Sequence, residues 1–160
     1  MVEPKTSDEI PPGWPPPRRL LAHRHRRWLA STKRSLAEAA RCARRVAAAS
    51  GCDDDTAADV EIAVREAMAN AIWHGNGKRS GSRIFFRCYG GPQAGVVIAV
   101  RDEGVGFDPE TVPDPRSAQR VELEHGRGLF LMRALMDLVR YRRGGREVVL
   151  FHGRCAADGS

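Results

Sequence analysis

The spacing of apolar residues along the chain predicts three helices. Apolar side chains recur at helical spacing from about residue 32 to Ala49, from 53 to His74, and from 128 to 138. Ser31 or Thr32 can cap the first helix, since both carry a side-chain oxygen that can accept a hydrogen bond from a free backbone N–H. Acidic residues at 53–55 favour the start of the second helix, because they meet the partial positive charge there.

Short apolar runs bounded by turns predict the strands. They lie at 82–89, 95–102, 139–143 and 147–152, and residues 18–29 allow a further strand at the beginning. Gly144-Gly145 can join the last two strands as a hairpin. Because helices precede most strands and one helix is inserted among them, we expect an α+β fold. This is a two-layer sandwich, with helices packed on one face of a mixed, mainly antiparallel sheet.

Length and proline content indicate the domain organisation. The 160 residues suffice for one compact domain of ordinary size. Residues 1–17 hold six of the ten prolines and are expected to be a flexible tail. We therefore predict a single domain over 18–153 and a short tail over 154–160. Within the domain, residues 104–126 are rich in glycine, proline and charge, and a loop of that length is usually functional.

Charge and cysteine spacing narrow the function classes. The formal net charge of +6 comes from residues 18–45, which carry nine Arg and one Lys against one acid. This stripe is a solvated helix face or a docking surface for an acidic partner, and direct nucleic-acid binding is not expected. No cysteines form a C-x-x-C pair, which predicts free thiols in a reducing cytoplasm; they are Cys42, Cys52, Cys88 and Cys155. Without a signal-peptide pattern or a membrane-length apolar run, a cytoplasmic protein with no membrane partner is expected.

The second predicted helix carries the first candidate site. Glu66, Asn70 and His74 are spaced i, i+4, i+8 and share one side of the helix. Asparagine is a poor residue for a helix interior, because its amide competes for backbone hydrogen bonds. An amide oxygen is a suitable ligand for Mg²⁺, and a nearby carboxylate can act as a general base. Taken alone, the three side chains could equally form a solvated helix face.

Two glycine-rich segments add candidate binding residues. Asp102 ends an apolar strand and could accept a hydrogen bond from a ligand amino group, while Gly104 and Gly106 would let the backbone approach a flat ring. Gly126-Arg127-Gly128-Leu129 begins the third predicted helix, where free N–H groups can bind phosphate. Gly77-Lys78-Arg79-Ser80 lacks the spacing of a P-loop, and no third glycine follows Gly104 and Gly106 as a dinucleotide-binding motif would require. Each of the two candidate segments also has an ordinary turn interpretation, so their order along the chain matters more than either alone.

That order resembles the Bergerat ATP-binding fold. Helical Glu66-x-x-x-Asn70, then Asp102-x-Gly104-x-Gly106, then Gly126-x-Gly128-Leu129 is the arrangement of histidine-kinase catalytic domains, certain chaperones, type II topoisomerases and mismatch-repair proteins. Within this GHKL group, the segment from Glu66 to Gly75 and the ending Leu131 to Asp137 look most like the small anti-sigma-factor serine kinases. The resemblance covers roughly residues 30–152.

The resemblance implies a role for each matching position. Asn70 would hold Mg²⁺ on the phosphates of ATP, and Glu66 would be the general base for a serine hydroxyl. Asp102 would bind the adenine amino group. The remaining cofactor contacts would come from Gly104 and Gly106 at adenine, residues 107–126 as a lid, and Gly126, Arg127, Gly128 and Leu129 at the phosphates.

The final hairpin and His74 are less well matched to a role. The family usually places a threonine after the hairpin glycine, near adenine, whereas here Gly145 is followed by Arg146, Glu147 and Val148. His74 fits the family pattern, but a structural histidine at a helix end is the expected reading.

The resemblance also implies a function. It predicts an ATP- and Mg²⁺-binding anti-sigma factor with serine protein kinase activity, which phosphorylates an anti-anti-sigma antagonist of the STAS type and sequesters a sigma factor. Members of the family often form homodimers. The alternatives are a non-catalytic, ATP-gated binding module, and a detached histidine-kinase-type catalytic domain that would need its phosphoacceptor from another chain.

Overall fold

The computed structural model describes residues 10–77, 79–106 and 124–155. The elements follow one another in the order β1 (His23–Ala30), α1 (Lys33–Ala49), α2 (Asp54–Ala69), the π-helical turn η2 (Asn70–Gly75), β2 (Arg83–Gly91), β3 (Gly95–Arg101), α3 (Glu124–Leu135), β4 (Leu138–Arg142) and β5 (Glu147–His152), with a 3-10 turn, η1 (Arg18–Leu20), before β1. Among these described residues, no helix is long and apolar enough to cross a membrane.

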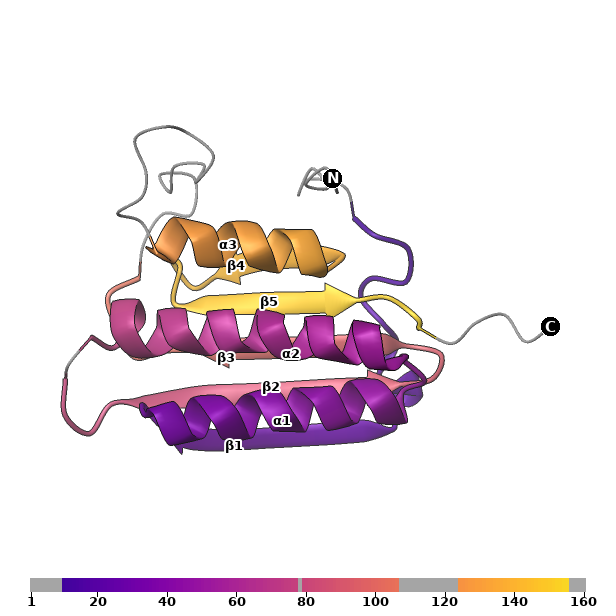
Figure 1. Ribbon diagram of the computed structural model, residues 1–160, viewed down its shortest axis with the longest axis horizontal. Coiled ribbons are helices and arrows are strands. Elements are labelled where there is room, and N and C mark those ends of the chain that lie inside the picture. The colour runs from indigo at the N-terminus through magenta and orange to yellow at the C-terminus, as the bar shows by residue number, and fades with distance from the viewer. Residues whose placement is uncertain (1–9, 78, 107–123, 156–160) are drawn as a thin grey trace.

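The five strands form one sheet in the order β1-β2-β3-β5-β4, and all four neighbouring pairs are antiparallel. The three helices lie side by side over one face of this sheet (Figure 1). The two-layer α+β sandwich predicted from the sequence is therefore confirmed, including the uncertain first strand, which begins at His23.

The hydrophobic core fills the space between the helices and the sheet. Small residues on α1 and α2 bring these helices close together and onto the strands; they include Ala39, Ala43, Val46, Val60, Val64 and Ala67. The largest side chains come from the sheet and the later helices, among them Phe86, Ile84, Ile98, Leu150, Met68 and Met132. The helix starts are capped as the sequence indicates, since Ser35 N–H donates to Thr32 Oγ1 (3.2 Å) and Thr56 N–H to Asp53 Oδ1 (2.8 Å).

The third helix differs from its predicted position. It was expected over 128–138 but occupies Glu124–Leu135, and β4 already begins at Leu138. The glycines of the Gly126–Gly128 segment therefore lie inside the first turns of the helix instead of preceding it. The N–H of Gly126 is among the first four of the helix, which have no internal partners, whereas Gly128 is already the fifth residue.

The prediction of free thiols is wrong for two of the four cysteines. Cys52, just before α2, forms a disulfide with Cys155, which follows β5, across a sequence separation of 103 residues. The wide spacing that argued against a disulfide is bridged because β5 ends beside the start of α2, a proximity that only the tertiary structure creates. Cys42 and Cys88 are free and buried.

Loss of this disulfide should destabilise the fold. The Cys52→Ser/Cys155→Ser double variant releases a long closed loop in the unfolded chain, and we expect the free energy of unfolding to fall by about 2–4 kcal/mol. Urea unfolding followed by tryptophan fluorescence measures the change. Dithiothreitol should lower the wild type to the level of the variant and leave the variant unchanged. Equal midpoints for oxidised wild type and variant would show that the bridge contributes nothing.

Candidate functional site

The end of the second helix widens at Asn70. α2 passes into the π-helical turn Asn70–Gly75, and the N–H of Asn76 donates to the carbonyl of Ala71 at 2.8 Å, five residues earlier. Single π-helical turns are rare in proteins, and those that occur are often found at functional sites. The sequence predicted an ordinary helix to His74, and the asparagine in its interior was the only signal of this irregularity.

A cavity of about 570 Å³ lies between α2, η2 and α3. The structure brings four predicted site residues together around it, namely Glu66, Asn70, Arg127 and Gly128, with His74 beside them. Ala69, Trp73 and Leu131 complete the lining and were not singled out from the sequence. Residues far apart along the chain therefore share one hollow of the size that small ligands occupy.

Gly128 allows the closest approach of the two helices at this cavity. A Cβ atom on Gly128 would lie 2.9 Å from Glu66 Oε2 and 3.3 Å from Asn70 Nδ2. Asn70 Nδ2 is itself buried and has no hydrogen-bond partner among the described residues. Buried polar atoms nearly always have a partner, so this free donor is suited to a ligand group that enters the cavity.

Glu66 has the electrostatics of a proton acceptor. Burial raises the pKa of its carboxyl above the ordinary glutamate value, because a charge is harder to hold away from water. A carboxylate with a raised pKa is a better general base near neutral pH. In this respect the environment of Glu66 agrees with the role that the resemblance implies.

Asp102 is in close contact with the backbone around it. The N–H of Gly104 donates to Asp102 Oδ1 at 2.7 Å, and a Cβ on Gly75 would overlap the Asp102 carboxylate. Burial raises the pKa of Asp102, while the Gly104 N–H and the nearby Arg146 act in the opposite direction. Asp102 does not line the first cavity, but Gly75, against which it packs, directly follows His74 of that cavity.

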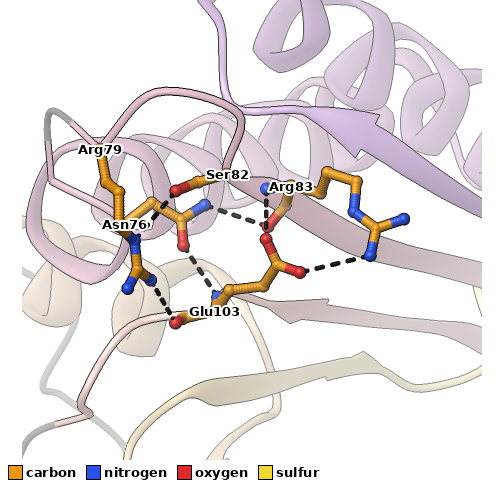
Figure 2. Close-up of polar contacts among 5 residues, drawn as sticks. All are labelled: Asn76, Arg79, Ser82, Arg83 and Glu103. Carbon is orange, nitrogen blue, oxygen red and sulfur yellow. Dashed lines mark hydrogen bonds and ion pairs between the residues drawn. The ribbon is translucent and has the colours of Figure 1, made fainter.

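Asn76, which follows η2, is hydrogen-bonded to Glu103 after β3 and to Arg83 at the start of β2 (Figure 2). Its Oδ1 accepts a hydrogen bond from the N–H of Glu103 (2.8 Å), and its Nδ2 donates to the carbonyl of Arg83 (3.0 Å) and to Ser31 Oγ (3.2 Å). On the other side, Glu103 Oε2 accepts from the N–H of Arg83 at 2.7 Å. Asn76 itself is buried, and it was not singled out from the sequence.

Removal of the Asn76 amide should loosen this junction. In Asn76→Ala the Glu103 N–H and the Arg83 carbonyl lose their partner in a buried place, and we expect a loss of about 2 kcal/mol in unfolding free energy. Chemical denaturation measures it. Asn76→Asp keeps the acceptor for Glu103 N–H, so it should be less affected than Asn76→Ala if that bond carries the effect. Identical losses in the two variants would contradict this account.

The turn between β4 and β5 lies against the segment that carries Asp102 and Gly106. Gly106 has a positive φ of 80°, and a Cβ there would overlap the carbonyl of Gly144. The carbonyl of Arg146 accepts the N–H of Asp102 at 2.9 Å. Arg146 thus stands beside Asp102 where the family usually has threonine, while Glu147 is buried and pairs with Arg87 at 3.0 Å.

Leu129 and Gly126, predicted to contact phosphate, do not line the cavity, and most of the predicted lid lies outside the described residues. The side chain of Leu129 is buried in the hydrophobic core, so it supports α3 from inside. Gly126 belongs to the first turn of α3. Of the predicted lid, residues 107–123 lie outside the described part of the chain.

The residues of the cavity fit a magnesium nucleotide. The described residues contain no group of three or more His, Cys, Asp or Glu that could enclose a metal. Mg²⁺ does not need such a cage, since it is usually bound by one or two protein oxygens together with substrate phosphates and water. Asn70 can offer its Oδ1 as such an oxygen, while its unpartnered Nδ2 and Arg127 can donate to phosphate oxygens where Gly128 allows close approach.

Comparison with known proteins agrees with this geometry. Residues 29–151 match the model of the histidine kinase-like ATPase domain. The chain is 34% identical over 97 residues to an anti-sigma F factor of Clostridium novyi, a match that covers 58% of this chain and 67% of the relative. It is 34% identical over 84 residues to the anti-sigma F factor of Clostridium acetobutylicum, covering 51% of this chain and 57% of that relative. The chain therefore belongs to the histidine kinase-like ATPase domain family, with the GHKL fold that its sequence motifs indicated.

Proposed function

We propose that this protein is an ATP- and Mg²⁺-binding anti-sigma factor with serine protein kinase activity. One observation carries the proposal, which is the cavity that gathers Glu66 and Asn70 from the end of α2 and Arg127 and Gly128 from the start of α3. The similarity to two anti-sigma F factors supports the same function.

In the proposed mechanism, the surroundings of Asp102 bind adenine, and the cavity of Glu66 and Asn70 holds the phosphates and the reacting serine. Asp102 accepts a hydrogen bond from the adenine amino group, and Arg127 with the first turn of α3 binds phosphate oxygens. Asn70 would hold Mg²⁺, which would neutralise phosphate charge. Glu66 accepts the proton of the partner's serine hydroxyl as that oxygen attacks the terminal phosphorus; the bond from this phosphorus to the bridging oxygen breaks, and ADP leaves. Phosphoryl transfer depends mainly on such positioning and charge compensation, which these side chains provide without a covalent intermediate.

The proposed partners are a sigma factor, which the protein would sequester, and an anti-anti-sigma protein of the STAS type, whose serine it would phosphorylate. A non-catalytic, ATP-gated binding module is the second candidate. It is favoured by Arg146, which stands beside Asp102 in place of the family's threonine. A threonine hydroxyl is therefore replaced by a cationic side chain next to the proposed adenine contact.

Phosphate transfer distinguishes the two candidates. The full chain is incubated with Mg²⁺ and γ-labelled ATP together with each STAS-type protein of the same organism. The kinase proposal expects label on one serine of one such protein, and loss of that label when the serine is replaced by alanine. An ATP-dependent rise in melting temperature without transfer to any of them would favour the binding module. No ATP effect on melting would contradict both.

A further inference from the structure

The face of the sheet turned away from the helices carries a row of arginines. Strand residues alternate between the two faces, and the residues that point away from the core cluster include Arg24, Arg26, Arg87, Arg101, Arg140 and Arg142. Aromatic rings lie among them, and the Arg26 and Arg87 guanidinium groups stand 5.7 and 5.6 Å from the centre of the Phe85 ring. The sheet therefore has a basic face that is separate from the helix-side cavity of Glu66 and Asn70.

Part of this face is hollowed out. A cavity of about 710 Å³ is lined by five arginines, which are Arg18, Arg24, Arg26, Arg87 and Arg142. We call it the arginine hollow. The proline-rich segment forms one wall with Trp14 and Pro15, and Tyr89 lies on the sheet side. Trp14 is held there by Phe151, whose ring centre is 5.2 Å from its own.

Charge in the arginine hollow is poorly balanced. Arg87 pairs with Glu147 at 3.0 Å, but its Nε is buried and has no hydrogen-bond partner among the described residues. Arg24 donates to the carbonyls of Leu21 and Arg18, which bring no negative charge. Within the described part of the chain, no ion pair joins Arg26 or Arg142 to an acid. Of the five arginines of the hollow, Arg87 alone has an ion pair to a carboxylate of the described residues.

Such a concentration of cations needs an anionic occupant of matching charge density. A second copy of this chain related by twofold symmetry would bring the same arginines against each other, because an isologous interface presents one patch to itself. Guanidinium groups bind phosphate oxygens through two parallel hydrogen bonds. A chain of adjacent phosphates places several negative charges close together, as the arginines place their positive charges. The enclosed volume lies within the usual range for small-molecule sites, which favours a small ligand over a long polymer.

We infer that the arginine hollow binds a small polyphosphate, a molecule that carries several adjacent phosphate groups. The ligand's phosphates take the free donors of Arg26, Arg142 and Arg87 Nε. The site lies on the sheet face opposite to the proposed nucleotide cavity and does not depend on it.

Isothermal titration of the full chain with sodium tripolyphosphate, in EDTA at constant ionic strength, tests the inference. We expect one equivalent to bind and the affinity to fall at least tenfold in Arg26→Ala/Arg142→Ala. The matched control is Arg41→Ala/Arg45→Ala, which removes the same charge from exposed positions on α1 and should stay within twofold of wild type. Asn70→Ala, in the other cavity, should also bind like wild type.

Three results of the tripolyphosphate titrations would overturn the inference. They are no binding by wild type, an equal loss in the two charge-matched double variants, and loss in Asn70→Ala with retention in Arg26→Ala/Arg142→Ala. A poly-glutamate peptide is titrated in parallel. Tighter binding of that peptide than of tripolyphosphate would also overturn it and assign the hollow to an acidic protein segment.

Discussion

Asp102→Asn is expected to abolish most of the rise in melting temperature that Mg-ATP produces. At a ligand concentration about 100 times Kd, binding to the folded state alone adds about 2.7 kcal/mol of stability. In the wild type, Asp102 Oδ1 is held by the Gly104 N–H, and the carboxylate is buried against Gly75. The amide of asparagine can keep the Gly104 bond through its oxygen, but its NH₂ group cannot accept a hydrogen bond from the adenine amino group.

The stability of the ligand-free variant separates lost binding from lost folding. Because burial raises the pKa of Asp102, the folded state holds its proton more tightly than the unfolded chain does. Ionised Asp102 therefore opposes folding at neutral pH, and Asp102→Asn without ATP should melt at the wild-type temperature or above it. Glu103→Gln, at the neighbouring carboxyl, is the control and should keep the ATP-induced shift. A full shift in Asp102→Asn would exclude Asp102 as the adenine ligand.

The same raised pKa predicts how ATP binding depends on pH. If the ionised carboxylate accepts the adenine hydrogen bond, affinity should be highest above the pKa of Asp102 and fall as the pH drops through it. The fall should begin at a higher pH than an ordinary aspartate would give. ATP titrations across this range measure it, and Asp102→Asn should remove this component of the dependence.

Local sequence signals predicted most of the fold and the first cavity. Thr32 and Asp53 cap their helices as expected, because capping depends only on nearby backbone groups. Glu66 and Asn70 share a side of α2 because positions i and i+4 are neighbours in any helix. Their meeting with Gly128 could be inferred only from the order of motifs that the family shares, since no local rule brings α3 onto α2.

The features that sequence reasoning missed arise from contacts between distant segments. The Cys52–Cys155 bridge joins residues that are 103 positions apart in the sequence and become neighbours only in the fold. Asn76 looked like a turn residue, and its buried bonds to Glu103 and Arg83 depend on how two loops meet. Arg24 and Arg26 of the sheet face were counted as part of a basic stripe over residues 18–45, because the sequence pattern did not fix the register of β1, which turns both away from the core.

Glu66→Gln should abolish phosphate transfer while it leaves ATP binding nearly intact. A general base contributes about 10²- to 10⁴-fold to rate, so we expect kcat for transfer to the partner serine to fall at least 100-fold. Glutamine has nearly the same shape and keeps an oxygen toward Gly128, so Kd for ATP should change by no more than about threefold, within the spread of a weak polar contact. Single-turnover transfer and an ATP titration measure the two quantities separately.

A control variant and the pH dependence of transfer distinguish a general-base role of Glu66 from a role in shaping the cavity. Glu61→Gln lies on the same helix, where Glu61 pairs with Arg44 at 2.7 Å outside the cavity, and should transfer phosphate like the wild type. Glu66 can accept the serine proton only when its carboxyl is ionised, and burial raises the pKa at which it ionises. Wild-type transfer should therefore decline as the pH falls through a value above the ordinary glutamate range, and the residual rate of Glu66→Gln should lack that decline. Unchanged transfer in Glu66→Gln would mean that the serine proton leaves by another route and that Glu66 only shapes the cavity.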